Sequence, residues 1–308
     1  MNFYSNGKLL LTGEYLVLDG AKALAVPTKL GQDLIVEEIK ERQLIWGSFT
    51  HTGECWFEAV FDLKKLRLIN CTFNSDKEGN ADFIAETLFG ILEEAKRLNP
   101  DFLNSENGFM VKTNLTFPRN WGLGTSSTLI NSIASWAKID AFQLLWNSFK
   151  GSGYDIACAQ NDSPIFYQIE NKKPVIELVT FNPSFKKDLF FVHLNQKQDS
   201  KEGIAKFRES SNDFQKEIER ISAISDAFLK ADSIETLNSL IFEHENIISS
   251  IIKIKTVKEK LFPDYFGEIK SLGAWGGDFV LATGNENTPA YFKNKGFEMI
   301  LSYSEMVL

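Results

Sequence analysis

Residues 117–128 read FPRNWGLGTSST and connect two sequence patterns of different period. Upstream, apolar residues occupy every second position from Phe109 to Phe117, a spacing typical of a strand that ends at Pro118. Downstream, apolar residues recur at helical spacing over 129–139. The chain therefore passes from a strand through a glycine loop and a hydroxyl cluster into a helix.

The glycine loop has the features of a binding site for an anion. Gly122 and Gly124 permit a tight turn and a close approach of the backbone to a ligand. The first amides of the helix, near Ser126, direct unpaired N–H groups and the positive end of the helix dipole toward the loop. A polyphosphate fits this arrangement. A simpler interpretation, in which Thr125 and Ser126 only cap the helix, explains the same residues equally well.

The remaining sequence predicts an α+β fold in two units. The first sixty residues contain short apolar runs separated by glycines, which indicate strands and hairpins. Helical spacing occurs over 82–98 and in two long stretches within 214–252, and the chain ends with strands around a glycine turn. We expect a boundary near Lys187, which gives domains 1–187 and 188–308. The length of 308 residues agrees with this division, because a domain averages about 150 residues.

The composition excludes disorder and indicates neither a nucleic-acid nor a membrane partner. Hydrophobic residues make up 44% of the chain and charged residues 24%, which is ordinary for a folded protein. The net charge is −8, so we expect no general attraction to nucleic acid or to anionic membranes. No apolar run reaches the roughly 18 residues of a membrane span, and the N-terminus lacks a basic stretch before an apolar core. We therefore expect a cytoplasmic protein.

Several common motifs are absent from the sequence. It contains no G-x-x-x-x-G-K-[ST] phosphate loop, and Gly122-Leu123-Gly124 lacks the third glycine of a dinucleotide-binding motif. Neither H-E-x-x-H nor G-x-S-x-G occurs. The three histidines are scattered and the three cysteines form no C-x-x-C pair. The sequence therefore predicts no zinc site and reduced cysteines.

Three further segments combine glycines with a charged residue. They read GKLLLTGEY at 7–15, KGSGYDIA at 150–157 and GAWGGD at 273–278. Each has a plain explanation when taken alone: Lys8 as a solvated charge, Asp155 as a helix cap and the glycines as turn formers. Their order along the chain, together with the glycine loop, is more informative than any one segment.

This series of motifs resembles the GHMP kinases, the superfamily of galactokinase, homoserine kinase, mevalonate kinase and phosphomevalonate kinase. The resemblance spans most of the chain, and GYDIA at 153–157 is similar to the bacterial subgroup named after that string. It implies a two-domain fold, with an N-terminal domain like ribosomal protein S5, a ferredoxin-like C-terminal domain and ATP in the cleft between them. It also implies an enzyme that transfers a phosphoryl group from ATP to a small molecule.

The resemblance assigns roles to individual residues. The loop around the ATP phosphates is expected to consist of Gly122, Leu123, Gly124, Thr125, Ser126 and Ser127, and Ser126 is also expected to hold Mg²⁺. Asp155 matches the catalytic aspartate, and Lys8 matches the lysine that pairs with it and with the transferred phosphoryl group. The substrate and nucleotide pocket is expected to contain Glu14, Tyr15, Gly273, Ala274, Gly276 and Gly277.

Within the superfamily, the expected acceptor is phosphomevalonate or mevalonate, which would place the protein in isoprenoid precursor synthesis. Tyr15 follows Glu14, and Asp278 follows Gly277, in patterns that resemble phosphomevalonate kinase. A phosphorylated acceptor needs positive charges near the site. The basic residues considered for this role are Lys22, Lys29, Arg119, Lys197 and Lys201. The sequence gives no prediction of the oligomeric state.

Two departures from the superfamily pattern favour an alternative. Residues 140–150 contain no glutamate to act as the second magnesium ligand of mevalonate kinases, and Trp275 replaces a glycine, where its side chain is expected to narrow the pocket. The alternative is a catalytically weakened relative that binds a nucleotide or a metabolite as a regulator. Lys8 and Asp155 favour the enzyme. A diphosphomevalonate decarboxylase, which shares the superfamily, is an enzymatic alternative.

Overall fold

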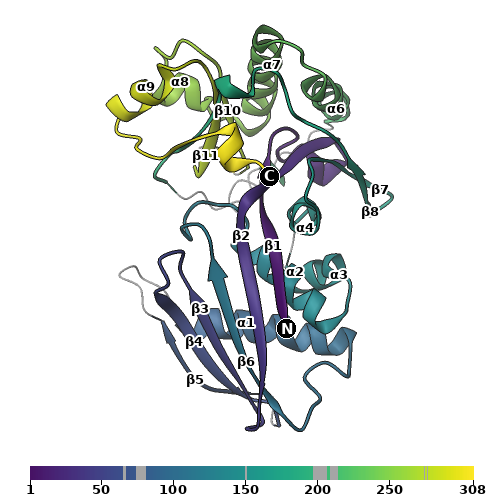
Figure 1. Cartoon of the computed structure of the whole chain (residues 1–308). Coiled ribbons are helices and arrows are strands. Elements are labelled where there is room, and N and C mark those ends of the chain that lie inside the picture. Colours follow the sequence, from purple (N-terminus) through teal and green to yellow (C-terminus); the bar gives the residue numbers. More distant parts are fainter. Residues whose placement is uncertain are drawn as a thin grey trace. The chain divides into compact units, whose positions relative to one another are not determined.

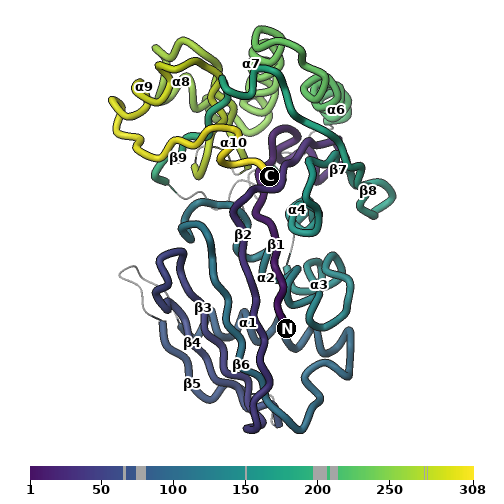
Figure 2. Tube along the Cα trace, viewed as in Figure 1, coloured from purple at the N-terminus to yellow at the C-terminus, as the bar shows by residue number. Residues whose placement is uncertain are grey.

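The computed structural model of the chain describes residues 1–64, 67–73, 81–149, 151–196, 207–208, 214–273, 275 and 277–308 (Figures 1 and 2). The chain forms two compact units, each built from separate segments. The first unit consists of Met1–Gly7, Leu30–Arg119 and Gly124–Gln160, and the second of Lys8–Lys29, Asn120–Leu123 and Asn161–Leu308. None of the described helices is long and apolar enough to cross a membrane.

A mixed β-sheet forms the centre of the first unit. Its strands follow the order β5-β4-β3-β6-β2, in which β3 and β6 are parallel and the other neighbours are antiparallel. They are β2 (Ala23–Ile39), β3 (Gln43–Phe49), β4 (Cys55–Asp62), β5 (Arg67–Phe73) and β6 (Gly108–Leu115), and β1 (Asn2–Leu10) pairs with β2. Alternate residues of β6, including Val111, Thr113 and Leu115, are buried, which confirms the strand predicted before Pro118.

Helices pack against one face of this sheet (Figure 1). The helices of the first unit are α1 (Ala81–Leu98), α2 (Thr125–Ala137), α3 (Ala141–Ser148) and α4 (Tyr154–Gln160). The helix predicted over 82–98 is confirmed as α1, which buries Leu88, Ile91 and Leu92 along one side. Because α2 contacts α1, α3 and α4, it is the central helix of the unit.

The second unit contains the ferredoxin-like arrangement predicted for the C-terminal domain. Its antiparallel sheet has the order β10-β11-β9-β12. Helices α6, α7 and α8 connect β9 to β10, and α9 connects β11 to β12, so the order is β-α-β-β-α-β. The bounds are β9 (Leu189–His193), α6 (Gln215–Leu229), α7 (Ile234–Ile252), α8 (Val257–Leu261), β10 (Ile269–Ser271), β11 (Phe279–Thr283), α9 (Thr288–Asn294), β12 (Ile300–Ser302) and α10 (Tyr303–Met306). The two long helices predicted within 214–252 are α6 and α7, which lie side by side (Figure 2).

The division of the chain differs from a single boundary near Lys187. The strands β7 (Ile165–Glu170) and β8 (Lys173–Leu178) belong to the second unit, where β7 pairs with the first residues of β2. The short helices η1 (Leu16–Asp19) and η2 (Lys186–Asp188) lie in the same unit. These strands belong to the second unit because β7 pairs with residues that are far from it in the sequence. Local sequence patterns do not reveal such pairing.

Candidate active site

Lys8 is attached to the glycine loop by both its backbone and its side chain. It lies near the end of β1, and its backbone N–H donates to the carbonyl of Leu123 at 3.0 Å. Its Nζ donates to the carbonyl of Gly122 at 3.0 Å. All three residues belong to the second unit. The lysine of the first motif and the start of the glycine loop are therefore in direct contact, and an ammonium group is held at the loop.

The backbone of Gly122 has a conformation and a neighbour that exclude other residues. Its φ is +66°, in the left-handed region that favours glycine. A Cβ atom at this position would lie 2.2 Å from Oδ2 of Asp278. Asp278, which the sequence marked only as the residue after Gly277, thus packs against the glycine loop and places a carboxylate beside it.

Trp121 fixes the loop to the sheet of the second unit. Its ring lies edge-to-face against Phe279, with centroids 5.2 Å apart, and 5.9 Å from the ring of His193. Nε2 of His193 is 3.4 Å from the carbonyl of Asn120. Phe279 and His193 are partners across β11 and β9, so the loop rests on adjacent strands. His193 belongs to no sequence motif, and its contacts in the structure are those of a packing residue.

The second half of the loop leads into α2 in the first unit. Gly124 precedes the helix with a φ of +95° and provides no side-chain cap. The hydroxyls of Ser127 and Thr128 donate to the carbonyl of Gly124 at 2.9 and 3.1 Å. Thr125 and Ser126 are helical residues, so the capping role considered for them is not observed. An uncapped helix of this length is suited to bind an anion at its start.

Asp155 is the second residue of α4 and is half-buried. It lies inside the helix rather than before it, so it is not the cap considered from the sequence. Asn131 of α2 fixes α4 from both directions: its Nδ2 donates to the carbonyl of Ala159 at 3.5 Å, and its Oδ1 accepts from Nε2 of Gln160 at 3.0 Å. The helices that carry Ser126 and Asp155 are therefore packed on each other in the first unit.

Glu14 and Tyr15 are buried in the second unit. Glu14 is 1% exposed, and its Oε1 lies 2.5 Å from Nζ of Lys270. Tyr15 is 8% exposed and packs against Phe207 at a centroid distance of 5.9 Å. Burial and, secondarily, the charge of Glu14 raise the pKa of Tyr15 to about 12. The burial indicates that Glu14 acts through its neighbours, and a direct contact of either side chain with a ligand stays a prediction.

The glycine turn after β10 is partly described. Gly273 has a φ of +62°, which explains a glycine at this position. Trp275 is 3% exposed and belongs to a core cluster with Tyr15 and with apolar residues of α6 and α7. Its side chain therefore fills the interior, and the expectation that it narrows a pocket is not supported. Of the other predicted residues, Gly277 is buried, and Ala274 and Gly276 lie outside the described residues.

The basic residues considered for an acceptor phosphate have different surroundings. Nζ of Lys22 pairs with Asp226 at 2.8 Å, and Nζ of Lys29 donates to the carbonyl of Ser304 at 2.6 Å. The guanidinium of Arg119 stacks on the ring of Trp56, with its Cζ 3.6 Å from the ring centroid. Burial lowers the pKa of Arg119, but an arginine so far above neutrality stays charged. The two remaining residues, Lys197 and Lys201, lie outside the described residues.

The described residues contain no group of three or more histidine, cysteine or acidic side chains arranged to hold a metal ion. A nucleotide-bound Mg²⁺ does not require such a group, because phosphate oxygens and water supply most of its ligands and the protein only one or two. Ser126 and Asp155 are oxygen donors of the kind that Mg²⁺ accepts. Ser126 as a magnesium ligand stays a prediction.

Comparison with known proteins gives a match at the level of structure. No protein-family model matches the chain, and no curated protein matches its sequence significantly. Phosphomevalonate kinase from Streptococcus pneumoniae, solved with phosphomevalonate and AMPPNP, has a TM-score of 0.69 at 15% identity over 98% of this chain and 99% of that one. Methanococcus jannaschii mevalonate kinase has a TM-score of 0.67 at 18% identity over 98% and 96%. Lactococcus lactis galactokinase with galactose has a TM-score of 0.66 at 14% identity over 96% and 88%.

These proteins, and a D-glycero-D-manno-heptose 1-phosphate kinase that also matches, are members of the GHMP kinase superfamily. The chain therefore has the α+β fold of the GHMP kinases, which confirms the fold expected from its motifs. At these identities the similarity defines the fold alone. The activity has to be inferred from the arrangement of residues in the two units.

Proposed function

We propose that this protein is an ATP-dependent kinase of the GHMP superfamily that phosphorylates a small molecule. The observation that carries the proposal is the attachment of Lys8 to Gly122, which holds a positive charge at a glycine loop leading into an uncapped helix. Backbone amides and a lysine are the groups that bind nucleotide phosphates in kinases. The structural neighbours include a complex with AMPPNP, which supports ATP as the phosphoryl donor.

Each residue has a defined role in this proposal. The amides of the loop from Gly122 to Ser127 bind the ATP phosphates, and Lys8 stabilises the charge on the transferred phosphoryl group. Asp155 orients the acceptor hydroxyl and accepts its proton as the new oxygen–phosphorus bond forms and the bond to ADP breaks. Ser126 is the protein ligand that we assign to Mg²⁺, which neutralises charge on the phosphates when it is bound.

The acceptor that we propose is phosphomevalonate or mevalonate. Kinases for both compounds are among the similar structures, and Asp278 follows Gly277 in the pattern that resembles phosphomevalonate kinase. Arg119 is the cation that we favour for an acceptor phosphate. Its stacking on Trp56 uses the face of the guanidinium, whereas a phosphate is bound by the N–H edge.

A second candidate function is that of a regulator which binds a nucleotide or a metabolite with little turnover. The observation in its favour is the lack of a glutamate in residues 140–150. A weakened metal site would reduce turnover more than it reduces binding, because the metal contributes mainly to charge stabilisation in the transition state.

The experiment that separates these functions measures ADP release and AMPPNP binding. ADP release is followed with ATP, Mg²⁺ and a panel of mevalonate, phosphomevalonate, homoserine and hexoses. The kinase proposal predicts saturable release with one acceptor, which Asp155→Asn removes and Asp101→Asn, a change at an exposed aspartate after α1, does not. AMPPNP binding without acceptor-dependent ADP release would favour the regulator. Failure to bind AMPPNP would reject the kinase and a regulator that binds a nucleotide.

A further inference from the structure

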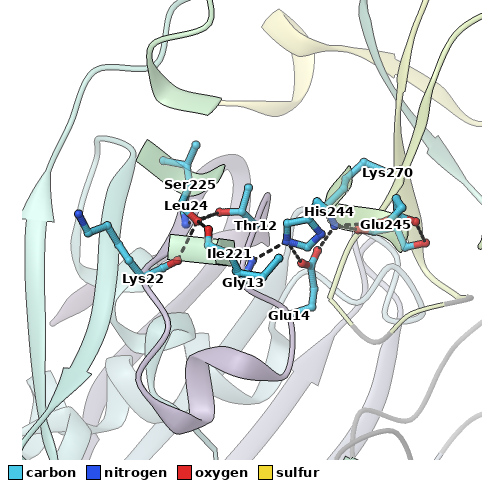
Figure 3. Close-up of polar contacts among 11 residues, drawn as sticks. Thr12, Gly13, Glu14, Lys22, Leu24, Ile221, Ser225, His244, Glu245 and Lys270 are labelled. Carbon is cyan, nitrogen blue, oxygen red and sulfur yellow. Dashed lines mark hydrogen bonds and ion pairs between the residues drawn. The ribbon is translucent and has the colours of Figure 1, made fainter. Parts of the chain in front are cut away.

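Four ionisable side chains meet in the interior of the second unit (Figure 3). They are Glu14 of the first motif, His244 and Glu245 of α7, and Lys270 of β10. Their exposed fractions are 1%, 0%, 3% and 0%. We call these four residues the buried ionic cluster. The mechanism proposed above uses none of them in direct contact with a ligand.

Lys270 holds together three segments that are distant in the sequence. Its Nζ lies 2.5 Å from Oε1 of Glu14 and 3.2 Å from Oε1 of Glu245. It also donates to the carbonyl of Ser271 at 2.6 Å. The hydroxyl of Ser271 donates to Oε2 of Glu245 at 2.9 Å. The ammonium group thus donates hydrogen bonds to Glu14 and to the carbonyl of Ser271 and forms an ion pair with Glu245, so its partners come from the first motif, β10 and α7.

His244 holds the same turn of the first motif through the backbone. Its Nε2 accepts from the N–H of Gly13 at 3.0 Å and lies 3.2 Å from Oε2 of Glu14. An Nε2 that accepts a hydrogen bond carries no proton, so the ring is neutral unless Nε2 gains one. Burial and the charge of Lys270 lower the pKa of His244 well below its usual value, which keeps the ring neutral. The turn is therefore bound at Gly13 by its backbone and at Glu14 by its side chain.

The residues on either side of this turn, Thr12 and Tyr15, show that its conformation depends on contacts with its surroundings. Oγ1 of Thr12 lies 2.6 Å from Oγ of Ser225, which attaches the turn to α6 as well (Figure 3). Tyr15 has a φ of +62°, a conformation that is unfavourable for a residue other than glycine. Such a backbone persists only where its surroundings determine it. The contacts of Thr12, Gly13 and Glu14 provide those surroundings.

The two segments that the cluster joins both lead to the glycine loop. Glu14 lies on the segment that begins at Lys8, whose Nζ donates to the carbonyl of Gly122. Lys270 lies on the strand that enters the glycine turn, and Asp278 at the end of that turn packs against Gly122. The cluster therefore fixes, at one point in the interior, two segments that meet again at the phosphate loop. Every residue in this connection belongs to the second unit.

Stability alone does not account for a buried cluster of this kind. Replacing buried ion pairs by apolar side chains of similar volume is often neutral or stabilising, because the charges lose their hydration. Three buried atoms of the cluster, Oε2 of Glu14, Nδ1 of His244 and Oε1 of Glu245, also lack a hydrogen-bond partner, which costs stability. What the network adds is a defined arrangement of the segments that it joins. Here those segments carry the lysine and the glycine turn assigned to phosphoryl transfer.

We propose that His244, Glu245 and Lys270 are positioning residues for the kinase reaction, which act through Glu14 and the glycine turn to hold Lys8 and Asp278 at the phosphate loop. The proposal rests on the proposed function. It predicts that turnover depends on the cluster at temperatures where the protein is fully folded.

The variant that tests this combines Glu14→Gln, Glu245→Gln and Lys270→Met. Removing both carboxylates together with the lysine leaves no unpaired charge in the interior, so the variant is expected to fold. The matched control is Lys258→Met, which removes a lysine that pairs with Glu268 at 2.8 Å near the surface of the same unit. Folding is checked by circular dichroism and cooperative melting. The kcat and the KM for ATP are then measured well below each melting temperature, and amide hydrogen exchange is measured over 12–15 and 270–273.

The expected result is a kcat lowered on the order of tenfold to a hundredfold in the folded triple variant, the range produced by a small displacement of reacting groups. Exchange over both segments should accelerate, and the control should match the wild type. A folded triple variant with wild-type kcat and KM would overturn the proposal, as would unchanged exchange. If the wild type phosphorylates no acceptor, the proposed function fails, and the exchange measurement still decides whether the cluster holds the turns. If the triple variant does not fold, Glu245→Gln alone is subjected to the same measurements and criteria.

Discussion

The substitution Glu245→Gln should remove a loss of stability that the wild type shows as the pH rises. Glu245 is buried on α7, where it follows His244, and it faces Lys270 and Ser271 from β10 and Glu14 from the first motif. Burial raises the pKa of Glu245 to about 7, with the charge of Glu14 adding to the effect and that of Lys270 opposing it. If both carboxylates of the cluster were ionised, the single lysine would leave one negative charge uncompensated. We therefore expect the folded protein to hold a proton on Glu245 below about pH 7 and to lose it as the pH rises above that value.

The sign and the size of the effect follow from this pKa. In the unfolded chain the carboxyl has the ordinary glutamate pKa of 4.5, so between these two pKa values the folded state binds more protons than the unfolded state. The free energy of unfolding of the wild type therefore falls as the pH rises through this range. From the two pKa values, the loss between about pH 5 and about pH 8.5 is on the order of 2–3 kcal/mol. Glutamine does not titrate, so the variant should gain that amount relative to the wild type over the same interval.

Urea unfolding at both pH values, followed by circular dichroism and by tryptophan fluorescence, measures the difference. The control is Glu243→Gln on the same helix, whose carboxylate pairs with Arg220 at 2.6 Å on the surface. Because that ion pair lowers the pKa of Glu243 further below both assay pH values, its loss should cost nearly the same stability at each of them, no more than about 1 kcal/mol. A stability difference between wild type and Glu245→Gln that is the same at both pH values would refute the assignment of a proton to Glu245.

Three other outcomes follow from the proposed kinase site. Gly124→Val should abolish the rise in melting temperature caused by ATP and Mg²⁺ without unfolding the protein. Valine does not tolerate the φ of +95° at this position, and its side chain blocks the approach of a ligand to the loop. An unchanged rise in melting temperature would show that the loop is not part of the phosphate site. Asp155→Asn should lower turnover by about a hundredfold or more and leave AMPPNP affinity nearly intact, and wild-type turnover in this variant would contradict the catalytic assignment. Arg119→Met should lower kcat/KM for phosphomevalonate far more than ATP affinity, and equal kcat/KM for mevalonate and phosphomevalonate in the wild type would reject a phosphorylated acceptor.

The sequence was sufficient for the elements whose apolar spacing is regular. The helices α1, α6 and α7 and the strand β6 lie where the spacing placed them, because each buries one face against neighbours in its own unit. The division into units was not predictable in the same way. It depends on the pairing of β7 with the first residues of β2, and nothing in either stretch identifies the other as its partner.

In the candidate site, the motifs pointed to the candidate residues but did not predict the surroundings of those residues. The proximity of Lys8 to Gly122 agrees with the expected roles of both residues. No sequence pattern indicated that Asp278 packs on Gly122, or that Trp275 points into the core, because both facts depend on contacts between distant segments. Glu14 was expected in a pocket because a glutamate after a glycine resembles the family motif. Its partner Lys270 is 256 residues away, and the motif contains no information about that distance.

The pair His244-Glu245 shows how burial changes the interpretation of a short motif. In the sequence it is only an incomplete H-E-x-x-H, and its scattered histidine indicates no metal site. Adjacent residues on a helix point in directions about 100° apart, so both are buried only where the helix is covered over a wide arc. Here the first motif and β10 cover the helix. The first motif contributes the acidic Glu14, and β10 contributes the basic Lys270. Since apolar side chains in these four positions would be expected to stabilise the unit as well or better, the contribution of the ionisable groups should be measured in turnover and in the mobility of the two motifs.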